Sequence, residues 1–246
     1  MVIQGMEQKQ IRVLSMGGGV QTTACLFKYW KEYDYVIFAD TGGETPETYQ
    51  YAIDYLKPFC ESKNLPWITV TKMEDDKPIT LEQYCLNSGQ IPSRNFKWCT
   101  DKFKRRPMNK ALRDLGATRK NPIIKDIGFS LDESHRMGKN EDPQYVQHNY
   151  PLLDDKITRR MCHEIIADAG FPQPPKSACY YCYNANKKEV LSLKVSHPDL
   201  FKRMEDMENN AKENFFNVSL SHFSQMNPLD EFFEEEVTCD SGHCFN

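Results

Sequence analysis

The chain has 246 residues, of which 39% are hydrophobic and 27% charged, a composition that excludes wholesale disorder. The formal net charge of −4 argues against a uniformly basic surface that coats nucleic acid. No apolar run approaches the roughly 20 residues that cross a bilayer, and residues 1–10 contain no apolar stretch typical of a secretion signal. We therefore expect a cytoplasmic globular protein with no membrane partner.

Strand-like and helix-like segments alternate through the first half of the chain. Strands are predicted at residues 11–14, 35–39, 67–70 and 122–130, with helices at 21–31, 47–59 and 101–115. This alternation predicts a three-layer α/β/α fold in which a mostly parallel sheet lies between helices, as in Rossmann-like proteins. Ligands of such sheets bind beyond the carboxyl ends of the strands. The loops at residues 15–22, 40–43 and 130–136 are expected to meet there.

The pattern changes near residue 155. Helices are predicted at residues 156–169, 186–196 and 198–214, with a proline-rich break at 172–175 after the first of them. We therefore expect an α/β domain over residues 1–155, followed by a small helical, cysteine-containing region over residues 156–246.

Three successive glycines, Gly17, Gly18 and Gly19, separate the first predicted strand from the first predicted helix. Without Cβ atoms, this backbone can turn sharply and bring its N–H groups close to phosphate oxygens. The partly positive N-terminus of the helix points to the same place, and Ser15 and Thr22 add hydroxyl groups. The segment has neither the lysine of a Walker loop nor GxGxxG spacing. It predicts a phosphate site, with an ordinary strand–helix turn as the alternative.

Four segments, in this order along the chain, carry a resemblance to a known superfamily. They are Ser15-Met16-Gly17-Gly18-Gly19-Val20-Gln21-Thr22, Phe38-Ala39-Asp40-Thr41-Gly42 with Pro46-Glu47-Thr48-Tyr49, Gly128-Phe129-Ser130-Leu131-Asp132-Glu133-Ser134-His135-Arg136, and Tyr150-Pro151-Leu152-Leu153-Asp154. The series resembles the PP-loop ATP pyrophosphatases of the adenine nucleotide α-hydrolase superfamily. Gln21, in place of the common aspartate, is similar to the PAPS reductase-like (sulfonucleotide reductase) branch. The last segment resembles the short strand that follows in that branch.

The resemblance implies that the chain binds ATP or another adenine nucleotide together with Mg²⁺. The implied nucleotide contacts are Ser15, Gly17, Gly18, Gly19, Gln21, Thr22, Asp40, Thr41, Gly42, Gly128 and Arg136. Asp40 would help to place Mg²⁺ and take part in catalysis, with a turn-forming aspartate as the alternative. Arg136 carries a planar guanidinium suited to phosphate or sulfate, with a surface charge as the alternative.

Nine cysteines in a reducing compartment indicate metal ligands, redox groups or buried thiols rather than disulfides. Cys179 and Cys182 form a CxxC pair, and Cys99 lies 80 residues before the first of them. Sulfonucleotide reductases that act on APS carry a cysteine pair at this spacing before a CxxC and bind a [4Fe-4S] cluster. Trp98 replaces one cysteine of that pair here. The resemblance therefore implies three cluster ligands.

The fourth ligand is left open. Cys162, Cys239 and Cys244 are candidates, and a cluster with three cysteines and no fourth protein ligand is an alternative that resembles some tRNA-thiolating enzymes. Zinc with a fourth cysteine or histidine is chemically possible as well.

The segment Cys239-Asp240-Ser241-Gly242-His243-Cys244 is a second group of cysteines. Sulfonucleotide reductases carry a Glu-Cys-Gly-x-His segment near their C-terminus, and this segment has similar residues in a different order. Cys239 or Cys244, activated by His243, would be a catalytic nucleophile. The alternatives are that these cysteines complete a metal site or belong to a frayed end.

Together these patterns predict an enzyme that cleaves ATP to AMP and pyrophosphate and activates a second substrate for sulfur or nitrogen transfer. Nucleoside or nucleic-acid modification is the expected context. Two alternatives stay open: a thiol-dependent APS or PAPS reductase, which is an oxidoreductase, and a non-catalytic nucleotide-sensing or interaction module. Besides the nucleotide, the expected partners are a nucleoside or nucleic acid, a thiol reductant or sulfur-donor protein, and further copies of the chain in a homo-oligomer. The basic residues 102–106 favour either a contact with substrate phosphates or a solvated helix face.

Overall fold

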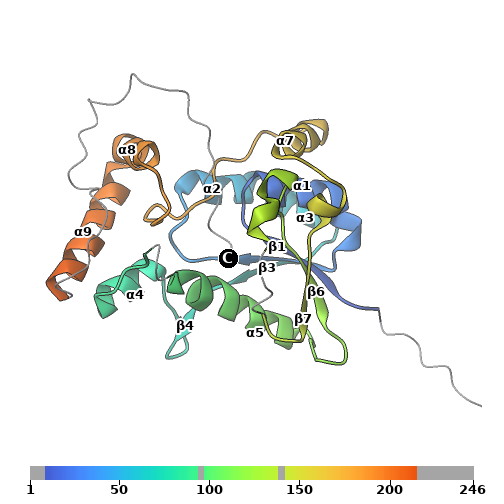
Figure 1. Ribbon diagram of the computed structural model, residues 1–246, viewed down its shortest axis with the longest axis horizontal. Coiled ribbons are helices and arrows are strands. Elements are labelled where there is room, and N and C mark those ends of the chain that lie inside the picture. The colour runs from blue at the N-terminus through green and yellow to red at the C-terminus, as the bar shows by residue number, and fades with distance from the viewer. Residues whose placement is uncertain (1–8, 94–96, 138–141, 215–246) are drawn as a thin grey trace, which may run out of the picture. The chain divides into compact units, whose positions relative to one another are not determined.

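The computed structural model describes residues 9–93, 97–137 and 142–214 (Figure 1). Contacts divide the chain into two compact units, each assembled from separate stretches of sequence. Unit 1 combines Met1–Ala39, Glu47–Val70 and Pro107–Ser177, and unit 2 combines Asp40–Pro46, Thr71–Arg106 and Ala178–Asn246.

Unit 1 contains a five-stranded sheet (Figure 1). Its strands are β1 (Arg12–Met16), β2 (Tyr35–Ala39), β3 (Trp67–Val70), β6 (Ile123–Asp126) and β7 (Val146–Asn149). They lie in the order β3-β2-β1-β6-β7, and every neighbouring pair is parallel. The strand order reverses at β1, so the carboxyl ends of β1 and β6 flank the position at which such sheets bind ligands.

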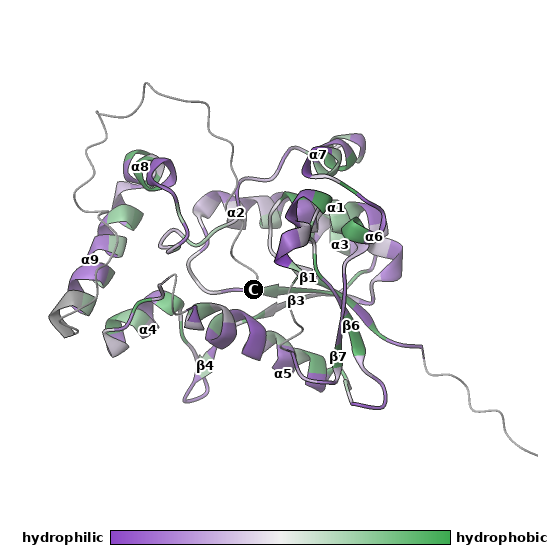
Figure 2. Cartoon of the chain, in the orientation of Figure 1, coloured by the Kyte–Doolittle hydropathy of each residue, from purple (hydrophilic) through white to green (hydrophobic). Residues whose placement is uncertain are grey.

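Helices cover both faces of this sheet, which confirms the predicted three-layer α/β/α architecture (Figure 1). The helical segments of unit 1 are α1 (Val20–Tyr29), η1 (Trp30–Glu32), α2 (Pro46–Tyr51), η2 (Ala52–Leu56), α3 (Lys57–Ser62), α5 (Arg106–Asp114), η4 (Leu131–Arg136), α6 (Pro151–Asp154) and α7 (Arg159–Asp168). Successive residues of β1 point to opposite faces. Leu14 packs with Leu26 of α1 and Ile166 of α7, whereas Val13 packs with Leu112 of α5. Helix α5 is hydrophilic on much of its remaining surface (Figure 2).

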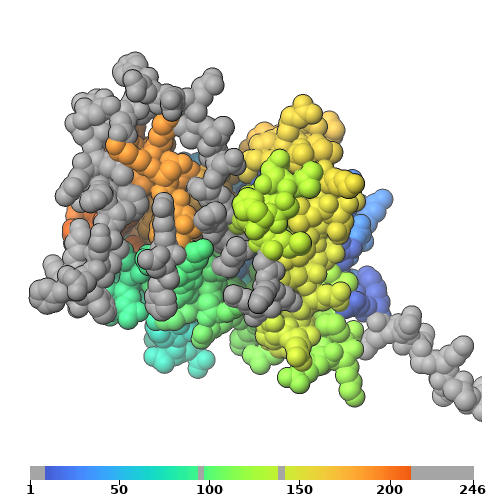
Figure 3. All heavy atoms as spheres, viewed as in Figure 1, coloured from blue at the N-terminus to red at the C-terminus, as the bar shows by residue number. Residues whose placement is uncertain are grey.

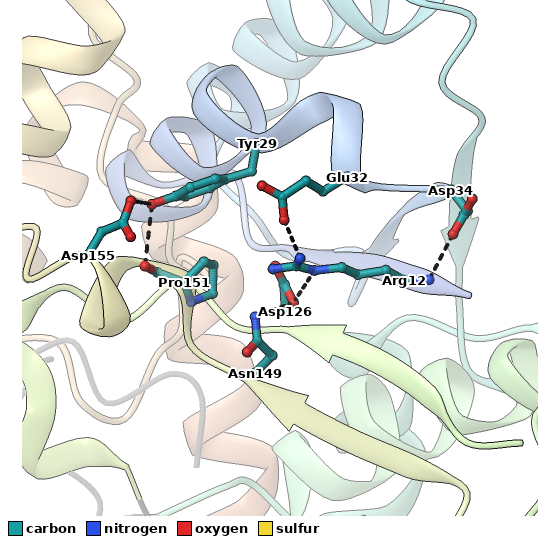
Figure 4. A network of polar contacts seen from close by, with 8 residues as sticks. All are labelled: Arg12, Tyr29, Glu32, Asp34, Asp126, Asn149, Pro151 and Asp155. Carbon is teal, nitrogen blue, oxygen red and sulfur yellow. Dashed lines mark hydrogen bonds and ion pairs between the residues drawn. The ribbon is translucent and has the colours of Figure 1, made fainter. Parts of the chain in front are cut away.

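A buried carboxylate links three strands of the sheet (Figure 4). Asp126, the last residue of β6, is fully buried. It accepts hydrogen bonds from Arg12 Nη2 at 2.8 Å and from Asn149 Nδ2 at 2.9 Å. Arg12 also forms an ion pair with Glu32. Because these residues come from β1, β6, β7 and η1, this network fixes the sheet where its strands meet the helix layer.

Unit 2 is mainly helical and has an apolar core of its own. Its elements are the hairpin β4 (Met73–Glu74) and β5 (Lys77–Pro78), followed by α4 (Leu81–Ser88), η3 (Thr100–Arg105), α8 (Lys187–Ser196) and α9 (Pro198–Asn214). Thr80 begins α4 with a capping box to Gln83. Arg203 of α9 forms an ion pair with Glu82 of α4, its Nε lying 2.9 Å from the carboxylate. No helix in the described ranges is long and apolar enough to span a membrane.

Several features differ from the sequence-based expectations. The strand predicted at residues 122–130 ends at Asp126, and β7 was not predicted. The short strand predicted at residues 150–154 is wrong: β7 ends at Asn149, and Pro151 begins the helical turn α6, a position that suits the fixed φ of proline. The contacts also divide the chain otherwise than at residue 155. Helix α7 packs on α1 within unit 1, while residues 71–106 join the cysteine-bearing segment in unit 2.

Candidate nucleotide and cysteine sites

The glycine loop connects β1 to α1 in unit 1. Gly18 has a φ of +77°, a left-handed conformation that glycine adopts without strain. A Cβ atom at this position would lie 3.1 Å from Thr48 Cγ2. Gly19 is the N-cap residue of α1 and has an extended backbone. Among the described residues, this N-cap makes no side-chain hydrogen bond to the first turn of the helix. The amides of the first turn are therefore the donors that an anion would meet at this end of α1.

Hydroxyl groups form hydrogen bonds with the backbone of the loop. The Gly17 amide donates to Thr22 Oγ1 at 3.3 Å, and Thr22 Oγ1 donates to the Gly19 carbonyl at 3.2 Å. Ser177, which no sequence pattern singled out, donates its hydroxyl hydrogen bond to the Gly17 carbonyl. Ser15 Oγ lies 3.5 Å from Met108 Sδ on α5. The structure thus uses the Thr22 hydroxyl to shape the loop.

The loop that follows β6 lies against the start of α1. A Cβ atom on Gly128 would lie 2.9 Å from Thr22 Cγ2 and 3.0 Å from the Thr22 amide nitrogen. Only a residue without a side chain allows this approach. The structure therefore brings Gly128 next to Gln21 and Thr22, three residues that the sequence assigned to the nucleotide.

Arg136 is buried rather than a surface charge. It lies at the end of η4, with 7% of its surface exposed. Its Nη1 atom lies 3.0 Å from Glu133 Oε1, and its guanidinium stands 4.6 Å from the centre of the Phe129 ring. The loop that carries Gly128 thus also holds a buried cation.

Asp40 follows the last residue of β2 and belongs to unit 2. Its Oδ1 atom accepts a hydrogen bond from the Gly42 amide at 2.7 Å, the geometry of a turn-forming aspartate. Gly42 has a φ of +72°, and a Cβ atom there would lie 2.4 Å from Thr80 Cγ2. Thr41 is buried beside it. The turn is thus packed tightly onto the start of α4, and a role of Asp40 in binding Mg²⁺ stays a prediction.

Three cysteines line one cavity in unit 2. Cys99, just before η3, lines it together with Cys179 and Cys182. Thr41 and Lys104 are polar residues of the same lining. The sequence predicted this grouping from spacing and resemblance, and the structure brings the three cysteines to the lining of one cavity.

The chain around Cys179 is held by backbone pairing and polar contacts. Glu44 and Cys179 form an isolated antiparallel bridge, which brings the CxxC segment onto the loop after β2. Thr41 Oγ1 lies 3.1 Å from Cys179 Sγ, and Glu44 Oε1 lies 3.7 Å from it. Lys104 Nζ lies 3.6 Å from the same Glu44 oxygen. Lys104 therefore balances the charge of the buried Glu44 carboxylate beside Cys179.

The basic residues 102–106 are engaged within unit 2. Lys102 stands over the Tyr84 ring at 4.7 Å, and Arg105 and Arg106 pair with Asp101. With Lys104 in the cysteine cavity, this stretch differs from a freely solvated helix face.

The three cysteines of this cavity carry the sulfur donors that either an iron–sulfur cluster or zinc takes. Within the described ranges, no three histidine, cysteine, aspartate or glutamate side chains lie close enough together to hold one ion. Zinc needs four ligands at about 2.0–2.3 Å from one point. In an iron–sulfur cluster each cysteine binds its own iron, so the sulfur atoms stand further apart. Cys99, Cys179 and Cys182 line one cavity and, in the part of the chain that the structure describes, form no disulfide.

Cys162, a candidate fourth ligand, does not line this cavity. It is fully buried on α7 in the core of unit 1, and burial raises the pKa of its thiol to about 12. A thiol in an apolar core stays protonated and is a poor metal ligand, which corrects that assignment. Cys85 of α4 lies in the apolar cluster against which Cys99 and Cys179 pack. The predicted nucleophilic segment with Cys239, His243 and Cys244 lies outside the described residues.

Comparisons with known proteins identify no family for the chain. No protein-family model matches it, and no curated protein matches it. Among solved structures, it is similar to the U34-tRNA thiolase NcsA from Methanococcus maripaludis with its [4Fe-4S] cluster. The identity is 16%, the match covers 87% of this chain and 76% of that chain, and the TM-score is 0.45. A similarity of this size assigns no activity.

Proposed function

We propose that the chain is a PP-loop enzyme that binds an adenine nucleotide with Mg²⁺ in unit 1 and cleaves ATP to AMP and pyrophosphate. The observation that carries this proposal is the loop at Gly17–Gly19. It joins a central parallel strand to a helix N-terminus, turns through a left-handed Gly18 and lies at the point where the strand order reverses. Backbone amides in this arrangement suit the pyrophosphate part of a nucleotide.

The reaction would be displacement at the α-phosphorus. An oxygen of a second substrate forms a bond to this phosphorus while the bond to the bridging oxygen breaks and pyrophosphate leaves. The loop amides and the N-terminus of α1 would stabilise the charge on the departing pyrophosphate. Arg136 would add a cation on the side of Gly128. The adenylated oxygen is then a good leaving group for a sulfur or nitrogen nucleophile.

In unit 2, Cys99, Cys179 and Cys182 would hold a [4Fe-4S] cluster, with zinc as the alternative. When bound, such a cluster would supply iron that can take up a sulfur species. Lys104 and Thr41 would stabilise the thiolates by charge and by hydrogen bonding. This donor set favours sulfur transfer to a nucleoside or nucleic acid, with a sulfur-donor protein or thiol reductant as the partner.

One assay separates this function from the alternatives. The full chain, purified without oxygen, is incubated with Mg²⁺ and ATP, APS or PAPS in the presence of a thiol, and pyrophosphate, AMP and sulfite are measured. Pyrophosphate and AMP from ATP are expected. Sulfite from APS or PAPS would instead identify a reductase, and nucleotide binding without any product would identify a sensing module.

A further inference from the structure

A buried carboxylate in unit 1 anchors a chain of polar side chains that the proposed function does not yet use. The side chain of Asp142 is 1% exposed. Its Oδ2 atom lies 2.7 Å from His148 Nε2 and pairs with the Lys125 ammonium, while Oδ1 accepts from Asn109 Nδ2 at 3.1 Å. These donors come from β7, β6 and α5, so three elements hold one carboxylate in place.

His148 extends this chain to a tyrosine. Its Nδ1 atom lies 3.3 Å from the hydroxyl of Tyr150. A carboxylate accepts but does not donate, so the proton of a neutral His148 lies on Nε2, facing Asp142. Nδ1 is then the acceptor for the Tyr150 hydroxyl. The order Asp142, His148, Tyr150 therefore has one consistent direction of hydrogen bonding.

The charges along this chain are set by its surroundings. Burial by itself would raise the pKa of Asp142, but hydrogen bonds from His148 and Asn109 and the charge of Lys125 hold it below its ordinary value. Burial, and next the negative charge of Asp142, raises the pKa of Tyr150. Tyr150 is therefore a poor free base. It can take up a proton only while it passes its own proton to His148.

Tyr150 lies at the sheet edge where the nucleotide is proposed to bind. It directly follows the last residue of β7, and its ring stacks on Phe129 with centroids 5.8 Å apart and planes 14° apart. Phe129 follows Gly128, whose backbone touches the start of α1. In Figure 3 the lime-coloured segment around η4 lies beside the yellow segment that follows β7. The series of hydrogen-bonded side chains thus begins at the buried carboxylate of Asp142 and ends at the half-buried hydroxyl of Tyr150.

We propose that Asp142, His148 and Tyr150 form a proton relay that removes a proton from the second substrate as it attacks the α-phosphorus. This inference rests on the proposed function and deepens it, because it names a class of substrate. The acceptor is a neutral oxygen nucleophile that must lose a proton, such as a lactam carbonyl with its ring N–H, a hydroxyl group or water. A carboxylate acceptor has no proton to lose and would need no relay.

The proton balance of the step is complete. As the acceptor oxygen bonds to phosphorus and pyrophosphate leaves, the acceptor's N–H or O–H proton moves to the Tyr150 oxygen. The Tyr150 proton moves to His148 Nδ1, and the imidazolium formed is paired with Asp142. Tyr150 would touch the substrate and is the catalytic residue, whereas His148 and Asp142 act through it.

The first experiment measures pyrophosphate release from Mg-ATP with water as the acceptor, using the full chain. Tyr150→Phe and His148→Gln should each lower kcat about 100-fold while the KM for ATP stays within about twofold. The double variant should be no slower than the slower single variant, because the two residues act as a unit. Tyr145→Phe removes a hydroxyl from a neighbouring tyrosine outside the relay and should keep wild-type activity.

The outcomes separate the two proposals. A wild-type chain that releases no pyrophosphate overturns the proposed function, whereas an active wild type with Tyr150→Phe within about twofold of it overturns the relay alone. A second measurement needs no activity: nitrogen NMR of the histidines, with His148→Gln for assignment. The Nε2-protonated form of His148 is expected, with an Nδ1 signal that shifts in Tyr150→Phe. A proton on Nδ1 would overturn the relay.

Discussion

At the scale of single residues, Gly18 carries most of the argument for a nucleotide. Its φ of +77° would strain any other residue, and the space beside it ends at Thr48. Gly18→Ala should cost about 1–2 kcal/mol of folding free energy and lower the affinity for Mg-ATP at least about tenfold, because its methyl group would meet Thr48 and Ser177 and shift the turn whose amides are proposed to face the phosphates. Calorimetric titration with Mg-ATP measures the affinity.

Gly170 offers a matched control for this substitution. It has a φ of +81°, and a Cβ atom there would meet nothing within 4 Å. Gly170→Ala should therefore lose a similar stability from the left-handed conformation but keep the wild-type affinity for Mg-ATP. Equal affinities in the two variants would refute the phosphate role of the loop.

The cysteines allow a second comparison at this scale. Cys179→Ala should remove the metal centre, seen as loss of iron and of visible absorbance from protein purified without oxygen, because Cys179 lines the cavity. Cys162→Ala should keep its iron and lose about 1–3 kcal/mol of stability, since it only empties core volume. Full metal content in Cys179→Ala would exclude Cys179 as a ligand.

Residue spacing predicted some of these neighbours and missed others. The distance of 80 residues from Cys99 to Cys179 was informative because a known family shares it. Ser177 and Glu44 carried no such signal, since a serine before a CxxC pair and a glutamate in a loop are ordinary surface residues. Cys162 misled because a buried core thiol and a ligand thiol look alike in sequence.

At the scale of elements, the strands were the easiest to predict. The structure has β2 at Tyr35–Ala39 and β3 at Trp67–Val70, as the apolar runs indicated. The prediction of a strand at residues 150–154 was wrong because Pro151 begins the helical turn α6 instead. The helix α4 has a mostly polar sequence, and unit 2 buries its weak apolar face at Leu81 and Cys85.

The Asp126 network ties elements together and should contribute strongly to stability. Asp126→Ala leaves the Arg12 guanidinium and the Asn149 amide without their acceptor and should cost about 3–5 kcal/mol in urea unfolding. Asp114→Ala, which breaks an exposed pair with Lys110, should cost less than about 1 kcal/mol. Similar losses in both variants would contradict this role of the network.

The contacts of Asp142 also predict how stability depends on pH. Its folded pKa lies below the unfolded value of about 3.9, so its contribution is complete above that pH and is lost as the pH falls toward the folded pKa. Asp142→Asn should therefore be less stable at neutral pH, and its unfolding free energy should decline less between about pH 5 and pH 2. If the unfolding free energy of wild type and variant declined equally over this pH range, Asp142 would contribute nothing to the pH dependence of stability.

At the scale of the whole molecule, the sequence predicted the fold class but not the division into units. Unit 2 takes in residues 40–46, 71–106 and the segment after Ser177. No composition shift marks these joins, because each unit is closed by contacts between distant stretches, such as the bridge from Glu44 to Cys179. A single boundary along the sequence therefore could not describe the two units.

The central claim is that the amides of Gly18 and Gly19 bind the phosphates of an adenine nucleotide. A crystal structure of the full chain with Mg²⁺ and an ATP analogue that resists cleavage between the α and β phosphates tests it most directly. We predict phosphate oxygens within hydrogen-bonding distance of these amides and of the first turn of α1. An analogue bound elsewhere in the molecule, with this loop unchanged, would contradict the account.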